Sequence, residues 1–288
     1  MAVQLEHLTA TTFSQHTWNR MVSAAAERAR VQERAVILSG DFALSVAERL
    51  GNPHYDVSHR VNALTVAKTF CGEDGNAEIV LNYRLLSRDG RRIESQGSAG
   101  SSSRYLAHEF YHAAVHSRGE PSVRPTRPLA TDAAFWLSNA WKLLDELRVE
   151  RALYAVDWPQ DIDFVGELEC TLDDFMSVVQ DPSADVAGFT TRRMNGLCDR
   201  LGHAAATSRL GCSPVWNRHG GTCRHEFLEV LREVPHAGTR STTGELVDHA
   251  DRIAHCLKHW YGEATGYRIE SPAPGSLLFV KDWAATKR

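Results

Sequence analysis

Residues 108–112 have the sequence His-Glu-Phe-Tyr-His, and this motif constrains the fold more than any other feature of the chain. Its two histidines are four positions apart, so on an α-helix both imidazoles lie on one face, about one turn from each other. Two imidazoles in that arrangement can bind one metal ion. Glu109 can face the same ion without binding it and can take a proton from a metal-bound water. The motif therefore predicts a helix that carries two zinc ligands, His108 and His112, and a general base, Glu109.

The residues around this motif favour a helix. Neither Pro nor Gly occurs between Ser103 and Arg118. Residues 96–103 are rich in Gly and Ser and predict a flexible loop, which we interpret as a solvated linker, with a mobile lid as the alternative. The serines at 101–103 are candidate N-caps of the helix, and Gly119 is a candidate stop. The apolar residues on both sides of the motif indicate that the helix is buried. The alternative to a metal site is a core helix with two hydrogen-bonded histidines.

Composition excludes several classes of protein. The chain has 288 residues, 43% hydrophobic and 24% charged, with a net charge of −4, which is ordinary for a soluble globular protein and gives no bulk attraction for nucleic acid. No run approaches the roughly 18 apolar residues of a membrane-spanning helix, and the first residues lack the basic start and apolar block of a signal peptide. We therefore expect a cytoplasmic protein with no nucleic-acid or membrane partner. Its oligomeric state stays open.

The six cysteines are predicted to be free thiols because no CxxC pair occurs. They are Cys71, Cys170, Cys198, Cys212, Cys223 and Cys256. Cys212 and Cys223, with His219 and His225 nearby, are the candidates for a second zinc site. Their spacing matches no common zinc-finger pattern, so we expect them to be reduced and without metal.

Hydrophobic periodicity divides residues 1–288 into two parts, which we expect to form one catalytic unit around the motif. An α+β part covers residues 1–119, and a mainly helical part covers residues 120–288. In the first part we expect helices over 15–35 and from Asp41 to about Gly51, strands over 60–70 and 77–86, and then the motif helix. In the second part we expect helices over 133–156, 162–179, 185–204, 223–233 and 243–262, and short strands over 267–270 and 277–280.

A zinc site needs a third protein ligand from elsewhere in the chain. His116 lies four residues beyond His112, but on a straight helix it is about 12 Å along the axis from His108. One ion cannot be held by all three histidines. We therefore expect His116 to be a cation near the helix C-terminus, a group that supports a ligand, or a solvated residue.

The helix expected over 133–156 offers a better third ligand. Its apolar stripe is predicted to consist of Trp136, Ala140, Leu143, Leu147 and Tyr154. Glu146 and Glu150 fall together on one flank of that stripe, at the edge of a buried surface, and Asp145 falls on the far side. One of the two glutamates can bind the ion while the other orients a ligand histidine. The alternative is a solvated acidic flank, in which they pair with Arg148 or Arg151.

The helix with His108-Glu109-Phe-Tyr-His112, followed by a helix with Glu146-Leu-Arg-Val-Glu150, resembles the zincin metallopeptidases of the gluzincin type. The resemblance covers roughly residues 60–155. It implies that His108, His112 and Glu146 bind Zn²⁺, that Glu109 is the general base, and that Glu150 supports His108. It also implies a small mixed sheet before the motif helix, with an edge strand that lines the substrate cleft. Glu150 stands where many members have Asp, and the gap from His112 to Glu146 is longer than in the best-known members.

The resemblance implies a zinc-dependent hydrolase with a zincin-like α+β fold, acting on a peptide or peptide-like substrate. Tyr154, His219 and His225 are candidates for stabilising the oxyanion of the reaction. Two alternatives are open. The same site would serve a hydrolase of a small peptide-like metabolite, and the motif would be coincidental in a helical interaction protein without catalysis.

Overall fold

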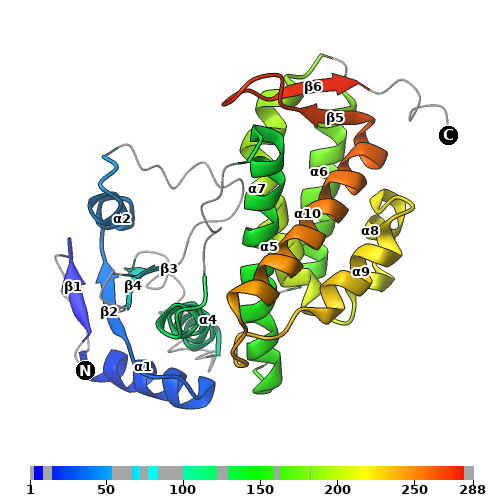
Figure 1. Ribbon diagram of the computed structural model, residues 1–288. Helices are drawn as coiled ribbons and strands as arrows, with labels where there is room; N and C mark the ends of the chain where they lie inside the picture. The colour runs from blue at the N-terminus through cyan, green and yellow to red at the C-terminus, as the bar shows by residue number, and fades with distance from the viewer. Residues whose placement is uncertain are drawn as a thin grey trace. The chain divides into compact units, whose positions relative to one another are not determined.

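The computed structural model describes residues 3–8, 15–53, 67–71, 77–83, 100–121, 129–158, 163–181 and 183–281. Helices dominate it and a small sheet accompanies them, so the mixed α and β composition expected from the sequence is confirmed (Figure 1). The chain divides into two compact units. Unit 1 comprises residues 1–120 and 152–161, and unit 2 comprises residues 121–151 and 162–288.

Unit 1 contains a four-stranded mixed sheet with the order β1-β2-β4-β3. The strands are β1 Gln4–Glu6, β2 Ala35–Ser39, β3 Ala67–Cys71 and β4 Ala77–Asn82. Strands β1 and β4 run parallel to β2, whereas β3 runs antiparallel to β4, with Thr69 opposite Ile79. Val36, Ile37 and Leu38 of β2 are almost fully buried, as expected for a central strand that is covered on both faces.

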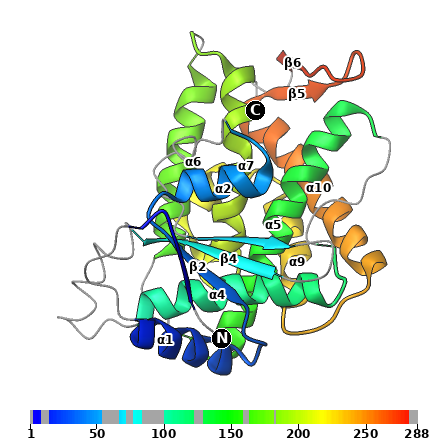
Figure 2. The ribbon, with the colours of Figure 1, turned by 90° about the vertical axis from the view of Figure 1, so that its left-hand side faces the viewer.

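Helices cover both faces of this sheet (Figures 1 and 2). Helix α2, Phe42–Leu50, packs on one face, and helix α4, Gly100–Ser117, packs on the other beside α1, Gln15–Ala29. On the α2 side, Phe42 and Val46 pack against sheet residues that include Val80 and Phe70. Alternation along β3 then directs Thr69 to the α4 side. The motif helix is therefore fixed to the sheet and to α1.

The helix expected from Asp41 to about Gly51 is confirmed as α2. The Asp41 side chain accepts a hydrogen bond from the Leu44 N–H, and Gly51 ends the helix with a φ of 59°. The helix expected over 15–35 is confirmed over 15–29 and is wrong at residues 30–35. It ends at Ala29 because Arg30 takes a left-handed conformation with a φ of 55°, and residues 35–39 form β2 instead.

The described parts of the strands expected over 60–70 and 77–86 form the antiparallel pair β3 and β4. Helix α4 begins at Gly100, before the serines at 101–103 that were expected as N-caps, so these serines lie in its first turn. Gly119 does follow the helix in a left-handed conformation, with a φ of 72°. Residues 54–66 and 84–99, which hold the rest of the expected strands and linker, lie outside the described residues.

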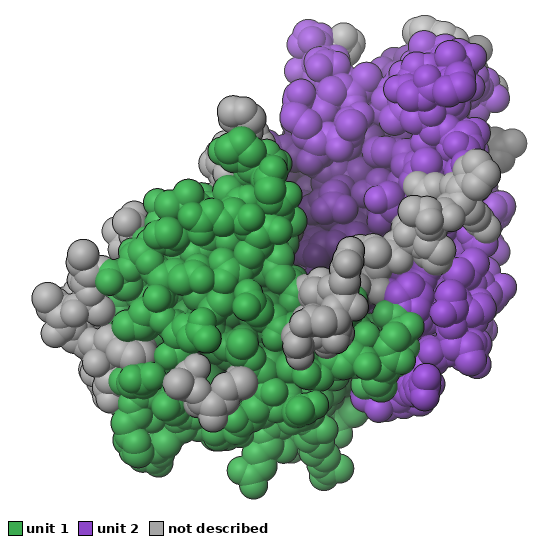
Figure 3. Space-filling view, turned by 60° about the vertical axis from the view of Figure 1, so that its left-hand side comes forward, with its two compact units in different colours: residues 1–120, 152–161 green, residues 121–151, 162–288 purple. Residues whose placement is uncertain are grey.

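Unit 2, purple in Figure 3, is mainly helical. Its long helices are α5 Thr131–Ala155, whose last turn belongs to unit 1, α6 Phe164–Gln180, α7 Val186–Ala205, α9 Arg224–Glu233 and α10 Thr243–Thr265. All five match expected helices to within a few residues. The two expected short strands are present as β5 Tyr267–Glu270 and β6 Leu278–Lys281, which pair as a hairpin. The 3-10 helix Leu210–Cys212 and helix α8 Pro214–His219 were not expected. None of the described helices has the length and apolar character needed to cross a membrane.

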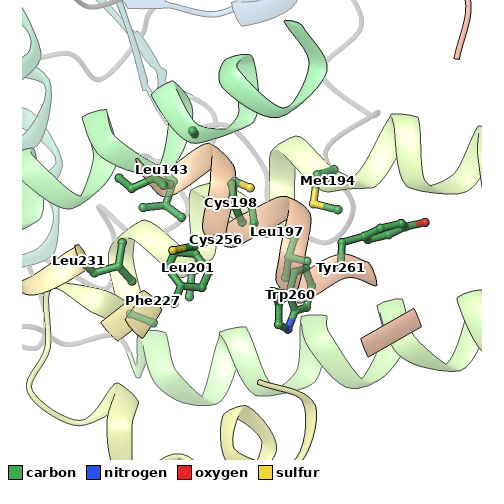
Figure 4. Packing of buried hydrophobic residues seen from close by; sticks show 14 of the residues in the cluster. Leu143, Met194, Leu197, Cys198, Leu201, Phe227, Leu231, Cys256, Trp260 and Tyr261 are labelled. Atoms are coloured by element: carbon green, nitrogen blue, oxygen red, sulfur yellow. The ribbon is translucent and has the colours of Figure 1, made fainter. Parts of the chain in front are cut away.

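One large apolar core holds unit 2 together (Figure 4). It gathers Leu143 from α5, Met194, Leu197 and Leu201 from α7, Phe227 and Leu231 from α9, and Trp260 and Tyr261 from α10. The predicted stripe on α5 is buried here, with the exception of Tyr154, which is 38% exposed. Leu137, Trp141 and Leu144 also join the core, so α5 is apolar around most of its circumference rather than along one stripe.

Helices α5 and α7 touch at a glycine. A Cβ atom on Gly202 of α7 would lie 2.8 Å from the Leu143 carbonyl oxygen and 2.9 Å from the Glu146 Cβ of α5. These distances are shorter than side-chain atoms tolerate, so the absence of a side chain at position 202 allows the two backbones to approach. Gly196, on the same helix, has no such neighbour within 4 Å.

We predict opposite effects for alanine at these two glycines. Gly202→Ala should lower the free energy of unfolding by about 1–3 kcal/mol, because the new methyl group forces α5 and α7 apart. Gly196→Ala, the matched control, should raise it by up to about 1 kcal/mol, because alanine is the better helix former. Urea denaturation followed by circular dichroism measures both. Equal stabilisation by the two substitutions would contradict the close contact at Gly202.

Candidate functional site

The motif helix α4 is anchored on its apolar side. Leu106, Ala107 and Phe110 are fully buried, and Tyr111 is nearly so. The Tyr111 hydroxyl donates a 2.8 Å hydrogen bond to the Ala29 carbonyl at the end of α1, and burial raises the pKa of this phenol. These contacts fix the rotation of α4 about its axis, and with it the directions of the motif side chains.

His108 and His112 lie together on α4, as the sequence predicts. Their Nε2 atoms are 3.0 Å apart, and their ring centroids are 4.8 Å apart with an angle of 67° between the planes. Two imidazole nitrogens bound to one tetrahedral zinc ion at about 2.0–2.1 Å would be separated by roughly 3.3 Å. The observed separation is close to that value. Imidazole nitrogen is also a preferred zinc donor, so this pair fits a zinc ion.

Glu109 contacts the sheet. Its Oε2 atom accepts a 2.6 Å hydrogen bond from the Thr69 hydroxyl on β3, and both residues are partly buried. Strand β3 is the last strand in the order β1-β2-β4-β3. The carboxylate expected to act as a base is thus held next to the edge of the sheet. The sequence analysis did not single out Thr69, because nothing in a strand pattern shows which residue faces a given helix side chain.

Glu146 and Glu150, on α5 in unit 2, are buried, with exposures of 4% and 0%. The sequence analysis placed them on the flank of the apolar stripe, and a solvated acidic flank was its alternative. Their burial contradicts that alternative. Burying a carboxylate is costly unless it is paired or binds a cation, so both side chains belong to a polar cluster within the helical core.

The members of this cluster come from α5 and α7. Lys142 makes ion pairs with Glu146 on its own helix and with the Asp199 carboxylate, the latter at 2.8 Å. Burial alone would raise the pKa of Asp199. The charges of Lys142 and His203, with the hydrogen bond from Lys142, outweigh that effect and hold the pKa of Asp199 below its usual value.

His203 is a member that the sequence analysis missed. Its Nδ1 is 2.8 Å from the Asp199 carbonyl oxygen, and since a carbonyl only accepts, Nδ1 carries the hydrogen. The other nitrogen, Nε2, is then directed at the two glutamates, 3.6 Å from Glu146 Oε2 and 3.7 Å from Glu150 Oε1. The one sequence signal was Gly202 beside it, since a glycine inside a helix often marks close packing.

Arg148 and Arg151, on the same helix as these glutamates, make hydrogen bonds to another part of unit 2. The Arg148 guanidinium, almost fully buried, donates to the carbonyl oxygens of Pro235 and Thr239 and to the Ser241 hydroxyl. The Arg151 guanidinium donates to carbonyl oxygens in the same part of the chain, residues 232–234. Both arginines therefore fasten α5 to the segment between α9 and α10.

Other candidate residues fall outside these clusters. His219 is bonded to the Asp173 carboxylate at 3.1 Å, and Tyr154 and His225 are exposed. His116 lies in the last turn of α4, as expected. Among the cysteines whose side chains are described, Cys170, Cys198, Cys212, Cys223 and Cys256 are free thiols. Burial raises the pKa of Cys223 to about 12 and that of Cys256 to about 11.

The structure thus brings the predicted residues into two local sets. His108, Glu109 and His112 form one set on α4 of unit 1, and Glu146 and Glu150 form the other on α5 of unit 2, with His203. The donors in the two sets, imidazole nitrogen and carboxylate oxygen, are those that zinc prefers. In comparisons with protein families, with curated proteins and with solved structures, the chain has no match. Side-chain chemistry is therefore the basis on which a function can be assigned.

Proposed function

We propose that this protein is a zinc-dependent hydrolase that cleaves peptide bonds. The observation that carries the proposal is the HExxH motif on a continuous helix, with the Nε2 atoms of His108 and His112 3.0 Å apart. In this proposal His108, His112 and Glu146 are the zinc ligands. When bound, zinc would supply Lewis acidity, which makes a water molecule a stronger nucleophile and polarises the carbonyl group of the substrate.

The proposed role of Glu109 follows from its position between the two histidines. It is adjacent to His108 on α4, and its Oε2 atom accepts a hydrogen bond from the Thr69 hydroxyl, which leaves lone pairs on the carboxylate that can accept a proton. It would take a proton from the attacking water and pass it to the leaving amine. Glu150 would orient a ligand histidine, since carboxylates of this kind fix the ring tautomer of metal-bound imidazoles.

The edge strand supports a peptide as the substrate. Among the described residues, β3 has a strand partner on one side only, and its Thr69 is bonded to Glu109. An extended peptide can add to such an edge through main-chain hydrogen bonds. A peptide bound there would lie next to the proposed base.

Zinc content tests the ligand assignment. We expect about one tightly bound zinc ion per chain, and His108→Ala and His112→Ala should be largely metal-free because each removes half of the histidine pair. His116→Ala, on the same helix, is the matched control and should keep its zinc. Elemental analysis after purification without chelators measures all four proteins. A wild-type protein without zinc would refute the enzyme assignment.

The proposed base can be separated from the ligands. Glu109→Gln keeps the shape of the side chain, so zinc content should be nearly unchanged. Peptide hydrolysis should fall by about a hundredfold or more, because the amide cannot accept the water proton. Parallel assays of metal content and of turnover on a library of internally quenched peptides measure the two effects. Zinc and activity falling together would make Glu109 a ligand or a structural residue.

Three acidic residues on α5 form an ordered series. Glu146→Ala should weaken zinc binding most, by more than about a hundredfold, because it removes a ligand. Glu150→Ala should weaken it by about 10–100-fold, as is typical for groups that orient a ligand. Asp145 is only partly buried, so Asp145→Ala should have little effect on zinc binding. Competitive titration with a chelator measures the affinities, and thermal melts show whether each variant is folded.

The order of the three losses in zinc affinity decides which residue of α5 is the ligand. A larger loss for Glu150→Ala than for Glu146→Ala would exchange the roles of the two glutamates. The largest loss for Asp145→Ala would show that the wrong face of α5 was assigned to the metal.

A further inference from the structure

The hydroxyl of Thr69 distinguishes the two carboxylate oxygens of Glu109. Thr69 Oγ1 is 2.6 Å from Glu109 Oε2 and 3.2 Å from the Glu109 backbone oxygen. A hydroxyl has one hydrogen, so it can serve only one of these acceptors at a time. The shorter contact falls in the range of 2.5–2.7 Å that is usual for a hydroxyl that donates to an ionised carboxylate. The hydrogen therefore lies on the Oε2 side.

The backbone oxygen of Glu109 is the weaker acceptor for the Thr69 hydroxyl hydrogen. Glu109 lies inside α4, which continues to Ser117, so its carbonyl has a helical N–H partner four residues on. The carboxylate oxygens of Glu109 take no part in this backbone hydrogen-bond pattern. The hydroxyl thus ties the Glu109 side chain to the sheet rather than completing the helix.

The strand that carries Thr69 is well placed to hold a side chain still. Thr69 is paired across the sheet with Ile79, which is fully buried, and its neighbour Phe70 packs on the opposite face. Threonine is β-branched and restricted in its rotamers, so its hydroxyl has few alternative directions. A glutamate has three side-chain torsions, and a hydrogen bond from a residue held in the sheet restricts them.

We propose that Thr69 is a positioning residue for Glu109. By holding Oε2 it leaves Oε1 as the oxygen that takes the proton from the attacking water. This role rests on the function proposed above, since it requires that Glu109 act as a base. A base that is displaced by about 1 Å can lose on the order of a hundredfold in rate, so the effect of the hydroxyl should be measurable.

Substitutions at position 69 test this role in the full-length protein. Thr69→Val keeps the branched shape and removes the hydroxyl, and Thr69→Ser keeps the hydroxyl. We expect Thr69→Val to lower kcat on the quenched-peptide library about 10–100-fold, with little change in KM and in zinc content. Thr69→Ser should stay within about threefold of the wild type. Ser117→Ala is the control, because it removes another hydroxyl from the α4 region, bonded to the Ala113 carbonyl, and should leave kcat unchanged.

A double variant distinguishes positioning from a structural role. On the Glu109→Gln background, Thr69→Val should cause no further loss, because Thr69 acts through the carboxylate that is already gone. Equal losses on both backgrounds would overturn the proposal, as would equal losses for Thr69→Val and Thr69→Ser.

The two proposals fail in different ways. If Glu109→Gln is impaired but Thr69→Val turns over like the wild type, only the role of Thr69 is refuted. If the zinc-loaded wild type cleaves no peptide, or Glu109→Gln cleaves at the wild-type rate, the proposed function is refuted, and the role of Thr69 is refuted with it.

Discussion

Burial of charge on α5 is the constraint around which unit 2 is organised. Glu146, Arg148 and Glu150 follow one another at alternate positions and are all buried, although an isolated charge in a protein interior is prohibitively costly. The neighbouring segments supply partners on different sides. The segment between α9 and α10 offers carbonyl oxygens to Arg148, and α7 brings His203 toward the glutamates. The close approach at Gly202 makes the second of these contacts possible, so packing and charge compensation depend on the same point.

In unit 1, apolar packing holds the motif helix in place. Helix α4 buries one side against the sheet and α1, and the motif side chains are directed by that packing. Apolar packing alone is non-directional and does not fix the orientation of α4. The hydrogen bonds from Tyr111 to α1 and from Thr69 to Glu109 fix that orientation. A shift in the register of β3 by one residue would turn Thr69 to the α2 face and place Lys68 or Phe70 opposite α4. The geometry of Glu109 therefore depends on how β3 pairs with β4.

Local signals explain which parts of the fold could be predicted. Helix α10 has a complete capping box at Thr242 and Glu245 and a glycine stop at Gly266, and its predicted range was nearly right. Strand β2 carries no turn signal before it, and the chain reverses at Arg30, a residue that rarely adopts a left-handed conformation, so the helix was extended too far. The motif histidines were found because their spacing is local. His203 and Thr69 were missed because their contacts join residues that are about 40 or more positions apart, and no periodicity reports such contacts.

The pairing of Lys142 with Glu146 is compatible with a ligand role for this glutamate. A carboxylate has two oxygens, and Lys142 bonds Oε1, while Oε2 is the oxygen nearer to His203. Carboxylates that bind metals are commonly hydrogen-bonded in turn by neighbouring groups, which hold the ligating oxygen in place. Glu150 shares His203 with Glu146, since both lie within 3.7 Å of the same nitrogen. Groups in one such network do not contribute independently. Loss of either glutamate therefore alters the charge and hydrogen bonding felt by the other, and the two act as one unit with Lys142 and His203.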